Sequence, residues 1–297
     1  MRRREMGRAE QAMTALRDKA AGRGMCPVKQ GGLMLVNSHQ GAGLVRIGVT
    51  QTPEYRNDTS GAIAHLVEVS ARAAATGVSL LVFPEGYLQG YLLGEQEIRA
   101  AALSLSSPAF EDVLAQFPSS GPVMVVGLIE EEAGSFFNTA IIVKARRLIG
   151  RYRKKHLLSA ERGYTSGNDC PIFEVDGLRF GISICYDTNF PDTARSIADA
   201  GASLIVCCAN NMLPRAKAEI YRDVHNEERA NRCRETGLWL ASSDVTGERG
   251  DMVSWGPGAI ITPAGEVVAQ LALGEAGLLI FDVPAAPTPS DVPRSLF

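Results

Sequence analysis

The segment 177–195, GLRFGISICYDTNFPDTAR, restricts the possible folds most, because it joins a strand to a helix through a cysteine. Apolar residues at the even positions from 178 to 184 have the period of a strand with a buried face. Cys185 ends this strand, and Pro191 stands in the first turn of the predicted helix. A thiol at such a turn can face a cleft, near backbone N–H groups that receive negative charge. The pattern indicates the position of a nucleophile, with a small apolar core residue as the alternative.

Strands and helices alternate along the rest of the chain. A helix over 58–76 is predicted to be capped by Asp58 or Ser60 and to bury Ile63, Leu66, Val67 and Ala74 on one face. The other expected elements are strands at 44–52, 78–91 (interrupted by proline), 121–132, 135–145, 147–157, 203–211 and 238–284 (several), a helical region at 95–117, and one long helix at 214–237. This order predicts an α/β fold in which two sheets pack together with helices outside.

The 297 residues divide into three parts by composition. Residues 1–44 begin basic and become Gly-rich and aperiodic, so we expect a poorly ordered N-terminal extension. Residues 45–285 carry the periodic pattern of one domain. Residues 286–297 form a Pro-rich C-terminal tail.

Composition excludes several function classes. A formal net charge of −3 argues against a nucleic-acid surface. No apolar run is long enough to cross a bilayer, so no membrane partner is expected. The 6 Cys lack CxxC spacing, which favours free thiols and a cytoplasmic location. The 4 His are scattered, and none stands at ligand spacing, so no metal site is predicted.

Two further segments end in residues suited to catalysis. Glu85 follows an apolar strand directly, where partial desolvation raises the pKa of a carboxyl and suits it to proton transfer; an exposed loop carboxylate is the alternative. Lys154 and Lys155 are adjacent on an extended chain, so at most one of them faces a cleft. A solvated basic edge is the alternative for this pair. His156 is expected to be a structural hydrogen-bonding residue.

Glu85, Lys154 and Cys185 each follow the end of an apolar strand, where functional groups meet at one edge of a sheet. A thiol with a reference pKa of about 8.5 is mostly protonated at neutral pH and needs a base, which Glu85 can supply. Lys154 carries positive charge that can stabilise both a thiolate and the oxyanion formed when sulfur attacks a carbonyl or nitrile carbon. The three residues have complementary chemistry.

The segments around these residues, FPEGYLQGY, YRKKHL and GISICYDTNFPD, occur in the order found in the nitrilase superfamily, the carbon–nitrogen hydrolases, which the chain resembles. Further similarity lies in ERGYTSGND, RCRETG and GPGAIITPAGEV. The resemblance implies a four-layer α-β-β-α sandwich of two mixed sheets, assembled into homodimers or higher homo-oligomers. It also implies a Glu85–Lys154–Cys185 triad without metal or cofactor, with Lys154 rather than Lys155 in the catalytic position. Glu161 would orient the substrate or the lysine, and the backbone N–H of Tyr186 would be the second oxyanion donor.

The same resemblance bears on the substrate. Tyr186 and Asp187 follow the cysteine where nitrilases usually have Trp and Glu, which favours a small amide or N-carbamoyl compound. NFPDTAR is similar to the branch of N-carbamoylputrescine and N-carbamoyl amino-acid amidases. Asp244 and Gly258 depart from the Asn and Ser of many amidases, so detailed specificity does not transfer.

Three alternatives remain open: a nitrilase, a thioester-based acyltransferase, and a non-catalytic binding protein on the same fold. An accessible catalytic Cys185 of low pKa would be alkylated ahead of the other thiols, and a binding protein would not show this selectivity. Arg195 and Arg215 are candidates for binding a substrate carboxylate, with a surface ion pair as the favoured alternative for each.

Overall fold

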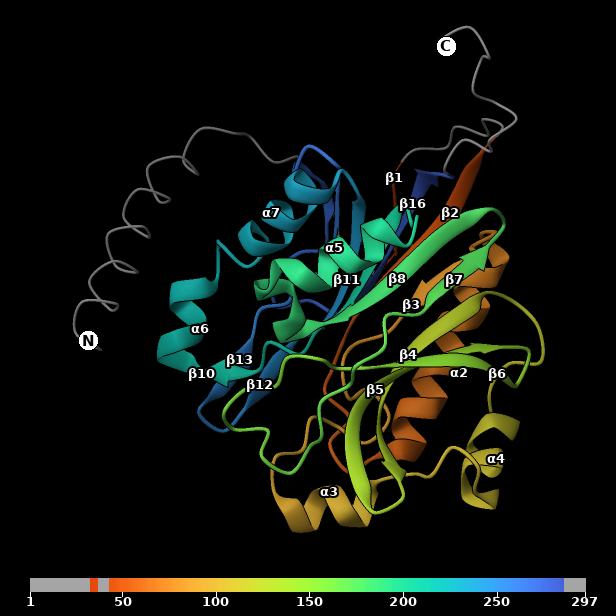
Figure 1. Cartoon of the computed structure of the whole chain (residues 1–297), viewed down its shortest axis with the longest axis vertical. Coiled ribbons are helices and arrows are strands. Elements are labelled where there is room, and N and C mark those ends of the chain that lie inside the picture. The colour runs from red at the N-terminus through yellow and green to blue at the C-terminus, as the bar shows by residue number, and fades with distance from the viewer. Residues whose placement is uncertain (1–32, 37–42, 286–297) are drawn as a thin grey trace, which may run out of the picture. The chain divides into compact units, whose positions relative to one another are not determined.

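The computed structural model describes residues 33–36 and 43–285, and its strands form two half-sheets (Figure 1). The first half-sheet has the order β6-β5-β4-β3-β2-β16-β1 and comprises β1 (Leu33–Val36), β2 (Leu44–Thr52), β3 (Leu80–Val82), β4 (Val123–Glu132), β5 (Ser135–Lys144), β6 (Arg147–Arg153) and β16 (Gly277–Pro284). The second has the order β7-β8-β9-β11-β14-β15 and comprises β7 (Ile172–Val175), β8 (Leu178–Ile184), β9 (Leu204–Cys208), β11 (Trp239–Val245), β14 (Ala259–Ile261) and β15 (Val267–Gln270). Both half-sheets mix parallel and antiparallel pairs.

Helices cover the outer faces of the half-sheets, with α2 and α4 on one side and α5 and α7 on the other (Figure 1). They are α2 (Thr59–Ala75), α3 (Glu95–Ala101), α4 (Pro108–Ala115), the 3-10 helix η1 (Cys185–Asn189), α5 (Pro191–Asp199), α6 (Arg215–Tyr221) and α7 (Glu227–Thr236). A small separate sheet is formed by β10 (Leu213–Pro214), β12 (Gly247–Arg249) and β13 (Met252–Ser254). Within the described residues, every helix is too short or too polar to span a membrane.

Alternation along the strands separates the core into three layers. One layer lies between the half-sheets and contains Ile47 and Val82 from the first together with Ile182 and Val206 from the second. Neighbouring strand residues point outward, where helices cover them in two further clusters. The order of layers is therefore helix, sheet, sheet, helix, which confirms the predicted four-layer sandwich. The short strand β3 is completely buried, as expected for a strand covered on both faces.

The half-sheets are joined at one point. The end of β11 pairs in parallel with the end of β2, with Asp244 opposite Gln51 and Val245 opposite Thr52. The two predicted sheets are thus continuous through a two-residue ladder. The strands β2 and β11 pair only through their last residues, so their carboxyl ends lie together at this join. The candidate site lies beside it.

Helix α2 shows how local chemistry and packing combine. Asp58 caps it as predicted, because its side chain accepts a hydrogen bond from the backbone N–H of Gly61 at 2.9 Å. Ile63 and Leu66 are buried against the first half-sheet, but Val67 and Ala74 are exposed, so this part of the predicted face is wrong. The face of α2 that packs against the half-sheet includes small residues, and its buried positions are Ala62, Ile63, Leu66, Val69, Ser70 and Ala73.

Three further expectations need correction. The helix predicted over 214–237 is interrupted between α6 and α7, although Gly237 ends it with a positive φ of 72°. The helical region 95–117 is two helices, because Ser107 starts α4 by accepting from Phe110 N at 3.2 Å.

Inside the expected extension 1–44, residues 33–36 form β1, which pairs in parallel with β16. A strand of four residues is too short to stand out by periodicity. The remainder of 1–42, and the tail 286–297, lie outside the described residues.

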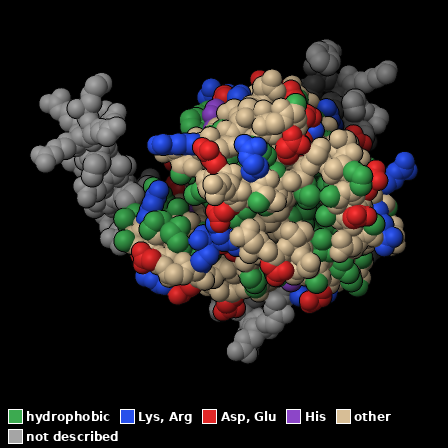
Figure 2. Space-filling model, turned by 90° about the horizontal axis from the view of Figure 1, so that it is seen from below, with side chains coloured by type: hydrophobic (Ala, Val, Ile, Leu, Met, Phe, Trp, Pro, Cys, Tyr) green, Lys and Arg blue, Asp and Glu red, His purple; other side chains and the backbone are tan. Residues whose placement is uncertain are grey.

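Acidic and basic side chains are interspersed on the molecular face seen in Figure 2, which agrees with the small net charge of −3. Arg215 pairs with Glu248 at 2.7 Å, with both side chains largely exposed. The surface ion pair is therefore the correct interpretation of Arg215 in this structure.

Candidate active site

Glu85 lies beside the join between the half-sheets. The chain leaves β3 at Val82, and the Glu85 N–H donates to Ala209 O, just after β9, at 3.3 Å. This backbone contact places the end of one half-sheet against the end of the other. The Glu85 residue is only 1% exposed, so the alternative of an exposed loop carboxylate is wrong.

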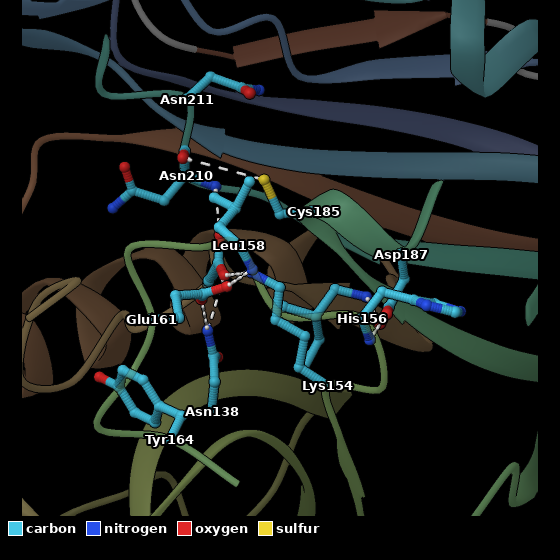
Figure 3. Close-up of polar contacts among 12 residues, drawn as sticks. Asn138, Lys154, His156, Leu158, Glu161, Tyr164, Cys185, Asp187, Asn210 and Asn211 are labelled. Atoms are coloured by element: carbon cyan, nitrogen blue, oxygen red, sulfur yellow. Dashed lines mark hydrogen bonds and ion pairs between the residues drawn. The ribbon is translucent and has the colours of Figure 1, made fainter. Parts of the chain in front are cut away.

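Lys154 and Lys155 face opposite environments, as expected for neighbours on an extended chain. Lys154 Nζ donates to Glu85 Oε1 and Glu161 Oε1, both at 2.8 Å, and the three side chains are at most 1% exposed (Figure 3). Lys155 instead pairs with Asp192 at 2.9 Å on the surface, where its side chain is 38% exposed. The interpretation of both lysines as a solvated basic edge is therefore wrong for Lys154. His156 Nε2 lies 3.0 Å from Asp192 and has a structural contact, as expected.

Both buried carboxylates are held at each of their oxygens. Asn138 Nδ2 donates to Glu85 Oε1 at 2.7 Å and to Glu161 Oε1 at 3.3 Å. The second oxygen of Glu161 accepts from Leu158 N at 2.6 Å, and the second oxygen of Glu85 accepts from Asn210 N at 3.1 Å. These bonds fix the orientation of the acids independently of the lysine, as a preorganised site requires.

Cys185 occupies the turn from β8 into η1 with a positive φ of 44°, which is uncommon for a residue other than glycine. Its Sγ lies 4.0 Å from Asn210 O, and Figure 3 shows the sulfur directed toward that loop. Asn210 therefore contacts Cys185 through its carbonyl and Glu85 through its N–H. The Tyr186 N–H lies in the first turn of η1, where backbone N–H groups precede the first intrahelical hydrogen bonds.

Asp187 ties the cysteine turn to the lysine segment. Its carboxylate accepts from Ile184 N at 3.0 Å, from Tyr152 Oη at 2.8 Å and from His156 N at 2.7 Å, and the residue is completely buried. Burial raises the pKa of Asp187, while these three donors and Lys154 oppose the increase. The position of the cysteine thus depends on the segment that carries Lys154.

Burial and neighbouring charges shift the pKa values of the three candidate residues. Burial and the nearby Glu85 raise the pKa of the Cys185 thiol well above its usual value, although Lys154 lowers it. Burial likewise raises the pKa of Glu85, against the opposing effect of Lys154. Burial disfavours the charge on Lys154, but Glu85, Cys185 and Glu161 outweigh it and raise the pKa of the ammonium. The pKa of Cys185 thus shifts in the direction opposite to that of an activated thiol, mainly because the sulfur is desolvated and secondly because Glu85 is near.

The arrangement can transfer a proton and stabilise an anion. Glu85 is a desolvated carboxylate whose raised pKa makes it a better proton acceptor than an ordinary carboxylate. Lys154 uses two of its three N–H donors on Glu85 and Glu161, which leaves one for a bound oxygen atom. In residues 33–36 and 43–285, we find no group of three or more His, Cys, Asp or Glu side chains that could hold a metal ion.

Several residues at the site were not predicted. Asn138 and Asn210 bond to Glu85, and Asp187 bonds to the neighbours of Lys154 and Cys185, but the sequence alone predicted none of these contacts. Asn138 had one available signal, because it is an amide inside the apolar strand SFFNTAIIV. A polar residue in a buried strand requires a partner.

A family comparison identifies the class of protein to which this site belongs. The family model for carbon–nitrogen hydrolases matches residues 46–288 of the chain. The chain belongs to the carbon–nitrogen hydrolase family. The predicted family is therefore confirmed, and its model spans all three candidate residues and the half-sheets apart from β1 and the first two residues of β2.

Individual relatives include hydrolases, amidases and nitrilases. A protein of Pseudomonas protegens named "Hydrolase in pqqF 5'region" is 30% identical over 246 residues, covering 80% of this chain and 83% of that protein. An (R)-stereoselective amidase of a Pseudomonas species is 28% identical, covering 76% and 80%. A nitrilase of Pyrococcus abyssi is 28% identical, covering 67% and 74%. Among solved structures, an amidase of Nesterenkonia sp. AN1 superimposes with a TM-score of 0.69 at 24% identity, covering 81% of this chain and 94% of that one, which supports the fold.

Proposed function

We propose that this carbon–nitrogen hydrolase cleaves a non-peptide C–N bond of a small linear amide or N-carbamoyl compound through a cysteine thioester. The main support is the contact of Lys154 Nζ with Glu85 at 2.8 Å, in a site where Asn210 connects Glu85 to Cys185. These contacts support the proposal that Glu85 is the base, Lys154 the cation and Cys185 the nucleophile of one site. An amide gives a carboxylic acid and ammonia or an amine, and an N-carbamoyl compound gives an amine and a carbamic acid, which breaks down to carbon dioxide and ammonia.

In the first half-reaction, Cys185 Sγ attacks the substrate carbon while Glu85 accepts the thiol proton. This transfer is needed because burial keeps the resting thiol protonated. The substrate oxygen becomes an oxyanion, stabilised by the remaining N–H of Lys154 and by the Tyr186 N–H. Glu85 then returns the proton to the nitrogen, the C–N bond breaks, and a thioester remains.

In the second half-reaction, water adds to the thioester carbon and Glu85 accepts a proton from it. The same two donors stabilise the second oxyanion. The C–S bond breaks, Glu85 returns the proton to sulfur, and the free thiol and a carboxylic acid result. One carboxylate therefore acts in both halves, and the enzyme ends each cycle in its starting protonation state.

Glu161 acts through Lys154. Its carboxylate lies 2.8 Å from Nζ and is itself fixed by Leu158 N at 2.6 Å. With Glu85 on its other side, the ammonium has only one direction left for an N–H. We therefore assign Glu161 the role of aiming this N–H at the substrate oxygen.

An amide is preferred over a nitrile because of the two residues that follow Cys185. Tyr186 and Asp187 replace the Trp and Glu usual after the nucleophile of nitrilases. An amidase stands among the relatives that cover most of this chain, and so does a nitrilase, which keeps nitriles in the experiment.

The test is ammonia release from a panel of ω-amides, N-carbamoyl compounds and aliphatic nitriles, with Cys185→Ala as the blank. We expect turnover of at least one amide or N-carbamoyl compound and none by the variant. Turnover of nitriles alone would show that the substrates are nitriles instead of amides or N-carbamoyl compounds. Equal ammonia release by Cys185→Ala would refute the thioester route. Mass spectrometry of the products with and without an added amine distinguishes hydrolysis from acyl transfer.

A further inference from the structure

Asp244 lies at the end of β11 with no exposed surface and accepts hydrogen bonds at both carboxylate oxygens. Oδ1 accepts from Asn211 N at 3.0 Å and from Val245 N at 2.9 Å. Oδ2 accepts from Arg229 Nη2 at 3.2 Å and from the side-chain amide of Asn211. Every partner is a donor. An asparagine at 244 would direct an NH₂ group against one of them, so these surroundings favour a carboxylate over an amide.

Arg229 compensates the negative charge of Asp244 in the protein interior. It comes from α7, its side chain is only 5% exposed, and its Nη1 donates to Asn226 Oδ1 at 2.9 Å and Pro257 O at 3.2 Å. Asp244 and Arg229 therefore neutralise each other in a buried pair, and loss of either partner alone leaves an uncompensated charge.

The pair is connected to the candidate catalytic residues by a single peptide group. The N–H that Asp244 accepts belongs to the Asn210–Asn211 peptide, whose carbonyl is the Asn210 O found 4.0 Å from Cys185 Sγ. This peptide is trans, so its N–H and C=O point in opposite directions. Holding the N–H on Asp244 therefore directs the carbonyl toward the thiol. The preceding N–H, on Asn210, donates to Glu85 Oε2 at 3.1 Å.

We propose that Asp244, neutralised by Arg229, is a positioning residue that holds the Asn210–Asn211 peptide against both Cys185 and Glu85. The proposal rests on the proposed function for its effect on turnover. Its geometric part concerns the free enzyme and needs no substrate.

A substitution at Asp244 has two separable consequences. Burial and Glu85 raise the pKa of the Cys185 thiol, and Asp244 adds to that increase, so removing its charge favours the thiolate. At the same time, the peptide is no longer held, and the Glu85 carboxylate loses a fixed donor. We therefore expect a Cys185 thiol that is more reactive and an enzyme that is slower, whereas general destabilisation would also speed the labelling of the buried thiols Cys207, Cys208 and Cys233.

The experiment measures iodoacetamide labelling of the Cys185 peptide by mass spectrometry from pH 6 to 10, together with kcat and KM. In Asp244→Asn we expect faster labelling at neutral pH than in the wild type. We expect kcat to fall about 10- to 100-fold with KM changed less than about threefold, as for a misplaced catalytic group.

A double variant, Asp244→Val with Arg229→Met, removes the peptide acceptor without leaving a buried charge, so it remains testable if Asp244→Asn does not fold. It should lose kcat to the same degree, while its labelling stays closer to the wild type because both charges are absent. The matched control is Asp282→Asn, which breaks the Arg46–Asp282 pair (2.8 Å) on β16 and should change neither readout.

Wild-type kcat in either folded Asp244 variant, or equal changes in Asp282→Asn, would overturn the proposal. If the wild type cleaves no compound of the panel, the proposed function fails, but a crystal structure of folded Asp244→Asn still decides the geometric claim, through the position of the Asn210–Asn211 peptide. An unmoved peptide in that variant would refute it.

Discussion

Lys154 and Lys155 are adjacent in the chain but belong to two different networks. Lys154 is buried between Glu85 and Glu161, and Lys155 pairs with Asp192 at the surface. Two aspartates that contact this part of the chain, Asp187 and Asp192, show the same difference in burial. Asp187 is completely buried and accepts from three donors, whereas the Asp192 side chain is 51% exposed. Identical residue types thus have different energetic importance, because burial removes the solvent that would otherwise satisfy or screen their charges.

The largest difference is expected between the two lysines. Lys154→Ala leaves two buried carboxylates without their cation and removes the proposed oxyanion donor, so turnover should fall by about three orders of magnitude or more. Lys155→Ala should change turnover by less than about twofold, since it removes only a surface ion pair. Ammonia release and thermal unfolding measured on both variants test this contrast. Similar losses in turnover would show that the networks are not functionally distinct.

The two aspartates should differ in stability. Asp187→Ala leaves Ile184 N, His156 N and Tyr152 Oη without their acceptor, which should lower the free energy of unfolding by at least about 2 kcal/mol. Urea denaturation measures this loss. A decrease below about 0.5 kcal/mol, the range of ordinary surface substitutions, would mean that water replaces the carboxylate.

The buried network should also titrate on the alkaline side. The pKa of Cys185 is raised by burial and Glu85, so above about pH 8.5 the folded state binds more protons than the unfolded state. Stability must then fall as pH rises, by up to about 1.4 kcal/mol per pH unit for this group. We expect the free energy of unfolding of the wild type to decline relative to Cys185→Ser between pH 8.5 and 10. Parallel curves would contradict the raised pKa.

The smallest effect on stability is expected for the exposed contacts of Asp192 with Lys155 and His156, and it should be lost at acid pH. Slight burial disfavours the charge on Asp192, but Lys155 and His156 outweigh it and lower the pKa of the carboxyl. Its contribution is therefore present above about pH 4 and lost as pH falls through the lowered value. Because this group is half exposed, Asp192→Asn should cost less than about 0.5 kcal/mol at pH 7, and high salt should abolish the difference. A larger, salt-independent loss would place Asp192 with the buried network.

Much of the fold and part of the candidate site could be predicted without coordinates. Alternating and continuous apolar runs located the strands that precede Glu85 and Cys185, and Asp58 marked the start of α2. Such features depend on neighbours in the chain, whose spacing is fixed by strand and helix periods. The same reasoning failed for Val67 and for the break between α6 and α7, where long-range packing decides.

The kinds of groups available for chemistry, and the family to which the chain belongs, follow from short segments of its sequence. The contacts that relate those groups do not. Asn210 and Glu85 are 125 positions apart, and Asp187 meets His156 across 31. Which lysine is buried, why the thiol stays protonated and how Asp244 reaches the cysteine all depend on groups brought together by the layers of the sandwich. The physical reason is that burial and charge compensation are properties of the folded surroundings and leave little trace in local periodicity.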